Sequence, residues 1–200
     1  MPNLDTVLSL KTNQTFLNGV QEIIGADNLK SAFNLAGIDS SNPVQVISFS
    51  SIDDLHKAFD ELFGTRGCQG VMQRSGRASF RYFLREFGQR FGLNAYEFRL
   101  LPNQQRLQVG LKKLARFFSN DRDLAVKIGH DDQSWYWKVY EPQKKSEYKS
   151  REILCQFSIG FLQDFLSWCG NGNNYQVTEV ACPTGGGQCY LIKIDKKPLE

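Results

Sequence analysis

Apolar residues recur at helical spacing through most of the first 120 positions. This periodicity predicts five helices, over residues 16–24, 28–36, 55–63, 78–91 and 104–118. A glycine follows each of the first three, and a glycine directly after the last periodic residue is a common helix end. A glycine-rich segment, residues 64–76, separates the third helix from the fourth. It lacks the lysine and the Ser/Thr of a phosphate-binding loop.

The last third of the chain changes to alternating patterns. Residues 124–128 and 135–139 alternate around a Gly-His-Asp-Asp turn, which predicts a β-hairpin. A helix over residues 153–168 follows, and two closing strands come after it, over residues 175–182 and 188–195. A shorter alternation predicts one more strand at residues 44–49. Helices first, then two hairpins separated by a helix, predict an α+β fold with helices packed on a largely antiparallel sheet.

Composition places the chain among globular domains. Its 200 residues are 41% hydrophobic and 22% charged. This length suits one ordinary domain with a real core, or two very small domains. We expect residues 1–42 to be an N-terminal helical extension and residues 43–200 to be the main domain. No apolar run approaches the roughly 18 residues of a membrane span. No signal-peptide pattern opens the chain, so we expect a cytoplasmic protein.

Charge and motifs narrow the classes of function. The net charge of +3 is too balanced for a dedicated nucleic-acid binder. No dinucleotide fingerprint, flavin motif or nucleophile–histidine arrangement is found. The absence of these motifs argues against an enzyme.

Five cysteines, an odd number, argue against a disulfide framework. Three of them and one carboxylate lie in the C-terminal third: Cys155, Glu179, Cys182 and Cys189. Three thiolates and one carboxylate would make a closed, four-ligand structural zinc site joining the last hairpin to the preceding helix. The alternative is that these cysteines are small buried hydrophobic residues.

Aromatic residues are abundant, with 15 Phe, 7 Tyr and 3 Trp. A pocket for a flat apolar ligand would be lined by such residues, although most aromatic residues serve as core. The candidate ligand contacts are Phe80, Phe83, Phe87, Phe157 and Phe161. Arg77 and Arg81 belong to a helical stripe with Arg74 and Arg85. This stripe is either a solvated face or a site for a ligand carboxylate.

The two histidines, His56 and His130, offer little support for haem sensing. His130 lies in the predicted hairpin turn beside two aspartates, which predicts an exposed residue. His56 lies beside apolar Leu55 and could ligate a tetrapyrrole metal only if it faced a pocket. Neither has a supporting motif.

Several short motifs resemble the 4-vinyl reductase-like domain family. They are Cys-Gln-Phe-Ser-Ile-Gly from Cys155, Glu-Val-Ala-Cys from Glu179, Gly-Gly-Gln-Cys ending at Cys189, and the Gly-x-x-x-x-x-Gly-Arg-Ala stretch from Gly70. The resemblance implies the nitric-oxide-signalling/Golgi-transport ligand-binding-like fold. That fold is shared by haem nitric-oxide sensors, vesicle-tethering TRAPP subunits and phenol-sensor domains. It also implies zinc held by Cys155, Glu179, Cys182 and Cys189.

From this resemblance we expect a hydrophobic ligand, a chlorophyll-type tetrapyrrole or precursor, and a role in chlorophyll biosynthesis or photosystem assembly. The alternative is a scaffolding module that works as a homodimer or with an assembly partner protein, with or without a bound acyl chain. A true vinyl reductase is the third hypothesis.

Overall fold

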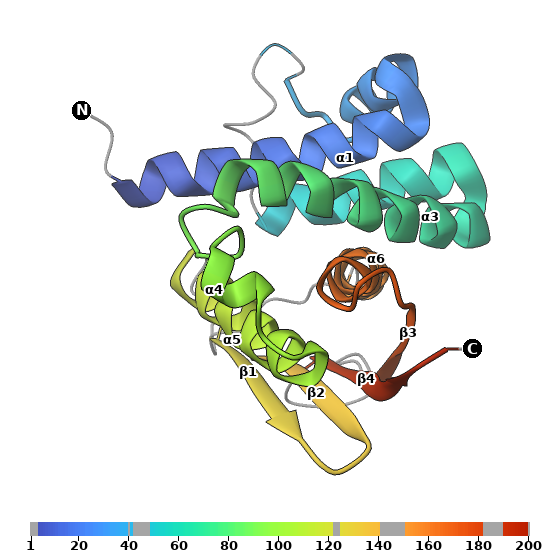
Figure 1. The fold of residues 1–200 in the computed structure, drawn as a ribbon. Coiled ribbons are helices and arrows are strands. Elements are labelled where there is room, and N and C mark those ends of the chain that lie inside the picture. Colours follow the sequence, from blue (N-terminus) through green and yellow to red (C-terminus); the bar gives the residue numbers. More distant parts are fainter. Residues whose placement is uncertain are drawn as a thin grey trace. The chain divides into compact units, whose positions relative to one another are not determined.

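The computed structural model describes residues 4–39, 41, 49–121, 125–140, 151–181 and 190–199. Its elements are, in order, α1 (Leu4–Leu35), α3 (Phe49–Phe87), α4 (Tyr96–Arg99), α5 (Asn103–Asp121), β1 (Ala125–His130), β2 (Ser134–Tyr140), α6 (Arg151–Cys169), β3 (Tyr175–Ala181) and β4 (Tyr190–Pro198) (Figure 1). The α+β prediction is confirmed, with helices first and two strand pairs separated by α6. Of the strand predicted at residues 44–49, residues 44–48 lie outside the described part, and Phe49 begins α3.

The chain forms two compact units. The first comprises Met1–Tyr82 and Glu147–Phe161, and the second comprises Phe83–Ser146 and Leu162–Glu200. The boundaries between the units therefore fall inside α3 and α6. The division predicted at residue 42 stays a prediction.

Positive-φ glycines shape the helices of the first unit. Gly25, at φ +80°, and Gly64, at φ +67°, break the regular backbone inside α1 and α3. Gly37, at φ +67°, follows the end of α1. These are the three glycines at which the sequence predicted helix ends, and glycine adopts this left-handed conformation at little cost.

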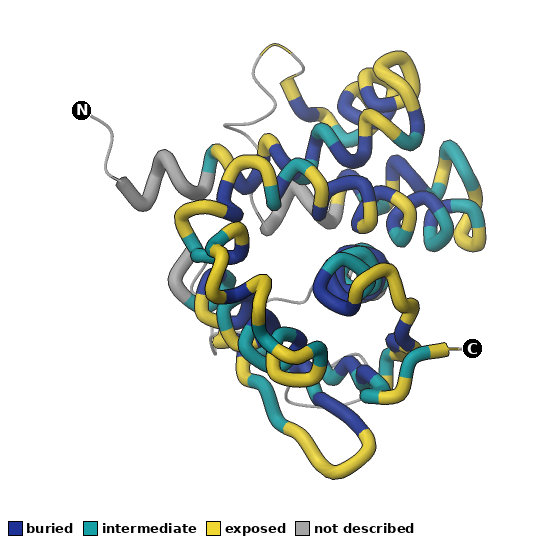
Figure 2. The backbone as a smooth tube through the Cα atoms, in the orientation of Figure 1, coloured by how far each residue is buried: buried dark blue, intermediate teal, exposed yellow. Residues whose placement is uncertain are grey.

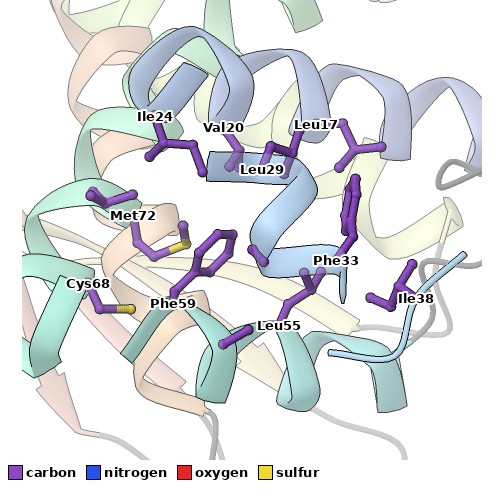
Figure 3. Packing of buried hydrophobic residues seen from close by; sticks show 13 residues of the cluster. Leu17, Val20, Ile24, Leu29, Phe33, Ile38, Leu55, Phe59, Cys68 and Met72 are labelled. Atoms are coloured by element: carbon purple, nitrogen blue, oxygen red, sulfur yellow. The ribbon is translucent and has the colours of Figure 1, made fainter. Parts of the chain in front are cut away.

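Residues on both sides of the breaks at Gly25 and Gly64 contribute to one apolar core. Thirteen buried residues of α1, the segment after it and α3 make up this core (Figure 3). They include Val20, Ala32 and Met72, which have no exposed surface. The Ser79 hydroxyl donates to the Phe16 carbonyl at 3.4 Å and joins α1 to the second half of α3.

The glycine-rich segment is helical, which corrects the prediction that it separates two helices. Residues 65–87 form one continuous stretch of α3 after the break at Gly64. One glycine of this segment, Gly76, is explained by close packing against α6. A methyl group at position 76 would lie 2.1 Å from the Phe157 carbonyl oxygen, and one at position 160 would lie 1.8 Å from the Gln73 carbonyl oxygen. Gly76 and Gly160 thus let two helix backbones touch.

Helix α6 is buried or half-buried from Cys155 to Cys169. None of the side chains in this range is exposed, and Figure 2 shows the same buried and half-buried colouring.

The second unit contains a four-stranded antiparallel sheet in the order β1-β2-β4-β3. Both predicted hairpins are therefore confirmed as strand pairs. Trp135 and Trp137 of β2 are 2% and 4% exposed, so they belong to the core rather than to a surface patch. Helix α5 packs beside β1, where the Val126 amide donates to the Ser119 hydroxyl at 2.9 Å.

Arg106 of α5 fixes the carboxyl end of α6. Its guanidinium donates to the carbonyl oxygen of Cys169 at 2.6 Å and to Asn171 Oδ1 at 2.6 Å. A third hydrogen bond, of 3.0 Å, reaches the Arg99 carbonyl oxygen. The last carbonyl groups of a helix lack intrahelical hydrogen-bond donors, and the Arg106 guanidinium supplies a donor for the one at Cys169. Its positive charge also lies at the negative end of the helix dipole.

Asp131 organises the turn between β1 and β2. Its carboxylate accepts from the Tyr136 hydroxyl at 2.6 Å and from the amides of Gln133 and Ser134 at 2.8 and 2.7 Å. The hydrogen bond from Tyr136, followed by those from the two amides, lowers the pKa of Asp131 below its ordinary value. Lys196 of β4 donates to the Asp131 carbonyl oxygen and ties the turn to the neighbouring strand.

The lowered pKa predicts how the turn responds to acid. The folded state favours the ionised carboxylate, so its contribution is complete above the ordinary aspartate pKa of about 3.9 and is lost as the pH falls through the lower folded pKa. We expect Asp131→Asn to destabilise the protein at pH 7 and to flatten the fall in stability between about pH 5 and pH 2. Urea midpoints measured across this range test it. Asp132→Asn, in the same turn, is the control, and parallel curves for Asp131→Asn and the unsubstituted protein would contradict it.

Candidate functional site

Three of the five predicted ligand-contact phenylalanines lie together in the first unit. The rings of Phe80 and Phe161 meet edge to face at 5.5 Å between centroids, and those of Phe157 and Phe161 stack at 6.4 Å. Phe157 also contacts Phe16 of α1 at 5.0 Å. Phe80 and Phe161 are buried, whereas Phe157 is half-buried and keeps surface for a further contact.

The other two phenylalanines, Phe83 and Phe87, belong to an aromatic cluster in the second unit. Their centroids are 5.2 Å apart, and each lies 5.0 Å from the ring of Phe117 on α5. Both are 1% exposed. Offset and edge-to-face pairs of this kind are the ordinary packing of an aromatic core. The structure therefore shows Phe83 and Phe87 as core residues, and their role as ligand contacts stays a prediction.

The arginine stripe on α3 faces outward. Arg74, Arg77, Arg81 and Arg85 are all exposed. Arg81 pairs with Glu22 of α1 at 2.5 Å, with side chains that are 62% and 36% exposed. An exposed ion pair contributes little to stability. This arrangement favours the solvated face over a carboxylate site, and ligand binding by Arg77 and Arg81 stays a prediction.

Only half of the predicted zinc set lies within the described residues. Cys155 is buried on α6, and Glu179 is half-buried on β3 opposite Ile192. Cys182 and Cys189 lie outside the described part of the chain. Among the described residues, neither Cys155 nor Glu179 belongs to a group of three or more ligand-type side chains close enough to share an ion.

A different group does have metal-ligand spacing. His56, Asp60 and Cys68 of the first unit place their ligand atoms within 4.8 Å of one another. The separation of four between His56 and Asp60 was visible in the sequence, because such residues lie one helical turn apart. The sequence could not predict that Cys68 lies beside these two residues, because it comes close to them only through the reversal of the chain at Gly64.

Solved structures with the same fold are H-NOX domains. No protein-family model and no curated protein matches the chain. An H-NOX protein from S. oneidensis in the Fe(II)NO ligation state matches 93% of this chain and 98% of its own, with a TM-score of 0.64 at 9% identity. An unliganded Fe(II) H-NOX protein from K. algicida matches 96% of this chain and 98% of its own, with a TM-score of 0.63 at 10% identity. A structure that probes heme distortion in the H-NOX family matches 96% and 97%, with a TM-score of 0.59 at 13% identity.

These neighbours correct the family resemblance. They are H-NOX domains and not 4-vinyl reductase-like domains, so chlorophyll biosynthesis, photosystem assembly and zinc binding lose the resemblance that supported them. The misleading motifs have a structural explanation. Two of their glycines, Gly76 and Gly160, are required where α3 and α6 touch, so they report helix packing rather than the chemistry of one family.

The H-NOX neighbours are described with heme and with Fe(II)NO, and the two histidines of this chain do not suit a haem iron. An iron-ligating histidine must point from the protein interior toward the porphyrin. His130 is exposed at the end of β1 and pairs with Trp135 across the hairpin. The His56 side chain is 18% exposed, and its Nε2 lies 3.3 Å from Asp60 Oδ2. Burial raises the pKa of the Cys169 thiol above its ordinary value.

Among the described residues, no helix is long and apolar enough to cross a membrane. The predicted cytoplasmic location and the predicted homodimer stay predictions.

Proposed function

We propose that this chain is a non-catalytic small-molecule-binding domain that holds a flat, apolar ligand without a histidine–iron bond. The observation that carries the proposal is the likeness to H-NOX domains along 93–96% of the chain. Those proteins are described with heme and with Fe(II)NO. A tetrapyrrole is therefore the first ligand class to test.

The histidine positions support this mode of binding. An exposed His130 and a His56 that faces Asp60 support a ligand held by burial of apolar surface rather than by coordination. Phe157 is the favoured contact among the five candidate phenylalanines, because it alone is half-buried. Its ring contacts with Phe16 and Phe161 would hold it in a fixed orientation for stacking.

The test compares haem with metal-free protoporphyrin in titrations followed by absorption and fluorescence quenching. We expect the two to bind with affinities within about threefold of each other, because the iron contributes no bond and threefold is well under 1 kcal/mol. Single variants His56→Ala and His130→Ala should leave the haem spectrum unchanged. Haem binding that is about 100-fold tighter than porphyrin binding, and that is lost in one histidine variant, would contradict the mode of binding proposed here.

Phe157→Ala tests the contact itself. Loss of one stacked ring should weaken porphyrin binding by about 5- to 10-fold. Phe91→Ala is the matched control, because Phe91 is also half-buried but lies in the second unit, outside the candidate set. Equal affinities for both variants would count against Phe157.

Native mass spectrometry of the purified protein tests whether any ligand is held. An organic adduct that is absent from the denatured mass supports the proposal. A bare monomer or dimer mass, together with no binding of either porphyrin, would overturn it, and a bare dimer would favour the scaffolding alternative.

A further inference from the structure

A reversal of the chain brings three ligand-type side chains together. His56 and Asp60 lie one turn apart in the first half of α3. The backbone then leaves helical geometry at Gly64, at φ +67° and ψ 160°, and the second half of α3 returns past the first. Cys68 lies one turn into that second half, beside Phe59 and Met72 at one side of the apolar cluster (Figure 3).

We propose that His56, Asp60 and Cys68 bind a divalent first-row transition-metal ion through one nitrogen, one oxygen and one sulfur atom. This site lies wholly in the first unit and shares no residue with the set Cys155, Glu179, Cys182 and Cys189. It is also independent of the small-molecule ligand proposed above.

The distances suit a common ion. Two ligand atoms that are each 2.0–2.3 Å from a tetrahedral metal ion lie about 3.3–3.8 Å from each other. His56 Nε2 and Asp60 Oδ2 are 3.3 Å apart. All three ligand atoms lie within 4.8 Å of one another, so a small rotation of the cysteine side chain completes the set.

Asp60 supplies a second, independent observation. Its other oxygen, Oδ1, is fully buried and has no hydrogen-bond partner. Leaving a buried carboxylate oxygen unsatisfied costs on the order of 1–3 kcal/mol or more, so such an atom calls for a partner. A cation bound between the carboxylate and the Cys68 sulfur would provide one.

Charge and ligand softness agree with a divalent transition metal. One carboxylate, one thiolate and a neutral imidazole give the bound ion a net charge of zero, which is tolerable in a half-buried place. Calcium and magnesium prefer oxygen ligands, whereas a mixed nitrogen and sulfur set selects ions of borderline softness. The side chains of His56 and Asp60 are 18% and 34% exposed, so a fourth position can hold water.

Cobalt(II) is the probe for this site. We expect the full-length protein, kept anaerobic with a non-thiol reductant, to bind one equivalent of Co²⁺. The expected signature is a thiolate-to-cobalt charge-transfer band together with the intense visible bands of tetrahedral cobalt. We also expect Co²⁺ to raise the melting temperature, because an ion that binds only the folded state stabilises it.

Substitutions assign the band to these residues. Cys68→Ser should abolish the charge-transfer band, and His56→Ala or Asp60→Asn should weaken Co²⁺ binding by more than about 100-fold, because even groups that only support a ligand are worth 10- to 100-fold. Asp60→Asn preserves size, so it keeps the test valid if Cys68→Ser perturbs the apolar cluster. Circular dichroism confirms folding of each variant.

Two controls separate this site from other ligands in the chain. His130→Ala and the double variant Cys182→Ser/Cys189→Ser should keep both the band and the stoichiometry. A band that survives Cys68→Ser but disappears in the double variant would overturn the proposal, as would the absence of saturable Co²⁺ binding in the unsubstituted protein.

Discussion

Gly160→Ala is expected to destabilise the protein by about 3 kcal/mol or more, at the upper end of the range for overpacked sites. The added methyl group would lie 1.8 Å from the Gln73 carbonyl oxygen and 2.7 Å from its carbonyl carbon. Both are backbone atoms of α3, so relief requires a shift of one helix rather than rotation of a side chain. For a chain of this size the melting temperature should fall by about 6–12 °C. Thermal and urea unfolding followed by circular dichroism measure the effect.

Two further glycines make the test specific. Gly76→Ala should behave like Gly160→Ala, because its methyl group would lie 2.1 Å from the Phe157 carbonyl oxygen. Gly70→Ala is the control: it lies in the same helix, and nothing stands within 4 Å of the added group. Relief of glycine's entropy cost should make this variant more stable by about 0.5–1 kcal/mol. Equal effects of Gly160→Ala and Gly70→Ala would show that α3 and α6 do not touch at these positions.

The glycines of α1 and α3 show which features the sequence could predict and which it could not. Gly25, Gly37 and Gly64 were predicted as helix ends, and each has positive φ. Gly70 and Gly76 look the same in the sequence but lie inside a continuous helix. At Gly76 the helix meets a partner backbone about 80 residues later in the chain, at Phe157, which no local pattern contains.

The strands followed a similar rule. Alternation and turn residues predicted β1, β2, β3 and β4 as two hairpins. The pairing of β2 with β4, opposing Trp137 to Ile192, joins the two hairpins into one sheet. Helix α6 lies between these two strands in the sequence, and their pairing depends on burial of both. The alternation pattern therefore did not predict which strands of the two hairpins are neighbours.

The candidate sites were harder to predict than the fold, because they depend on spatial neighbours. His56 was considered as a lone tetrapyrrole ligand, whereas its nearest ligand-type neighbours are Asp60 and Cys68. The four-residue step from His56 to Asp60 was readable. The position of Cys68 beside them could not be predicted, because it depends on both the positive φ of Gly64 and the packing of the two halves of α3.

Phe117→Ala is expected to cost about 3–5 kcal/mol, the usual range for removing a buried phenylalanine ring. Phe117 is 2% exposed on α5. Its ring lies at the centre of the aromatic cluster of the second unit, with centroid distances of 5.0, 5.0, 4.8 and 5.2 Å to Phe83, Phe87, Phe91 and Phe118. Its loss removes four ring contacts at once and leaves a cavity among closely packed side chains.

Two comparisons distinguish this role from a general effect of losing an aromatic residue. Phe117→Leu keeps most of the volume and should cost about 1–1.5 kcal/mol, so the difference between the two variants measures the cavity. Tyr96→Ala removes a ring that is 72% exposed and should change stability by less than about 0.5 kcal/mol. Urea unfolding of the three variants gives the order directly. A cost for Phe117→Ala no greater than that for Tyr96→Ala would mean that the cluster does not hold α5 against the end of α3, because a ring packed among four others cannot be removed without loss of their mutual contacts.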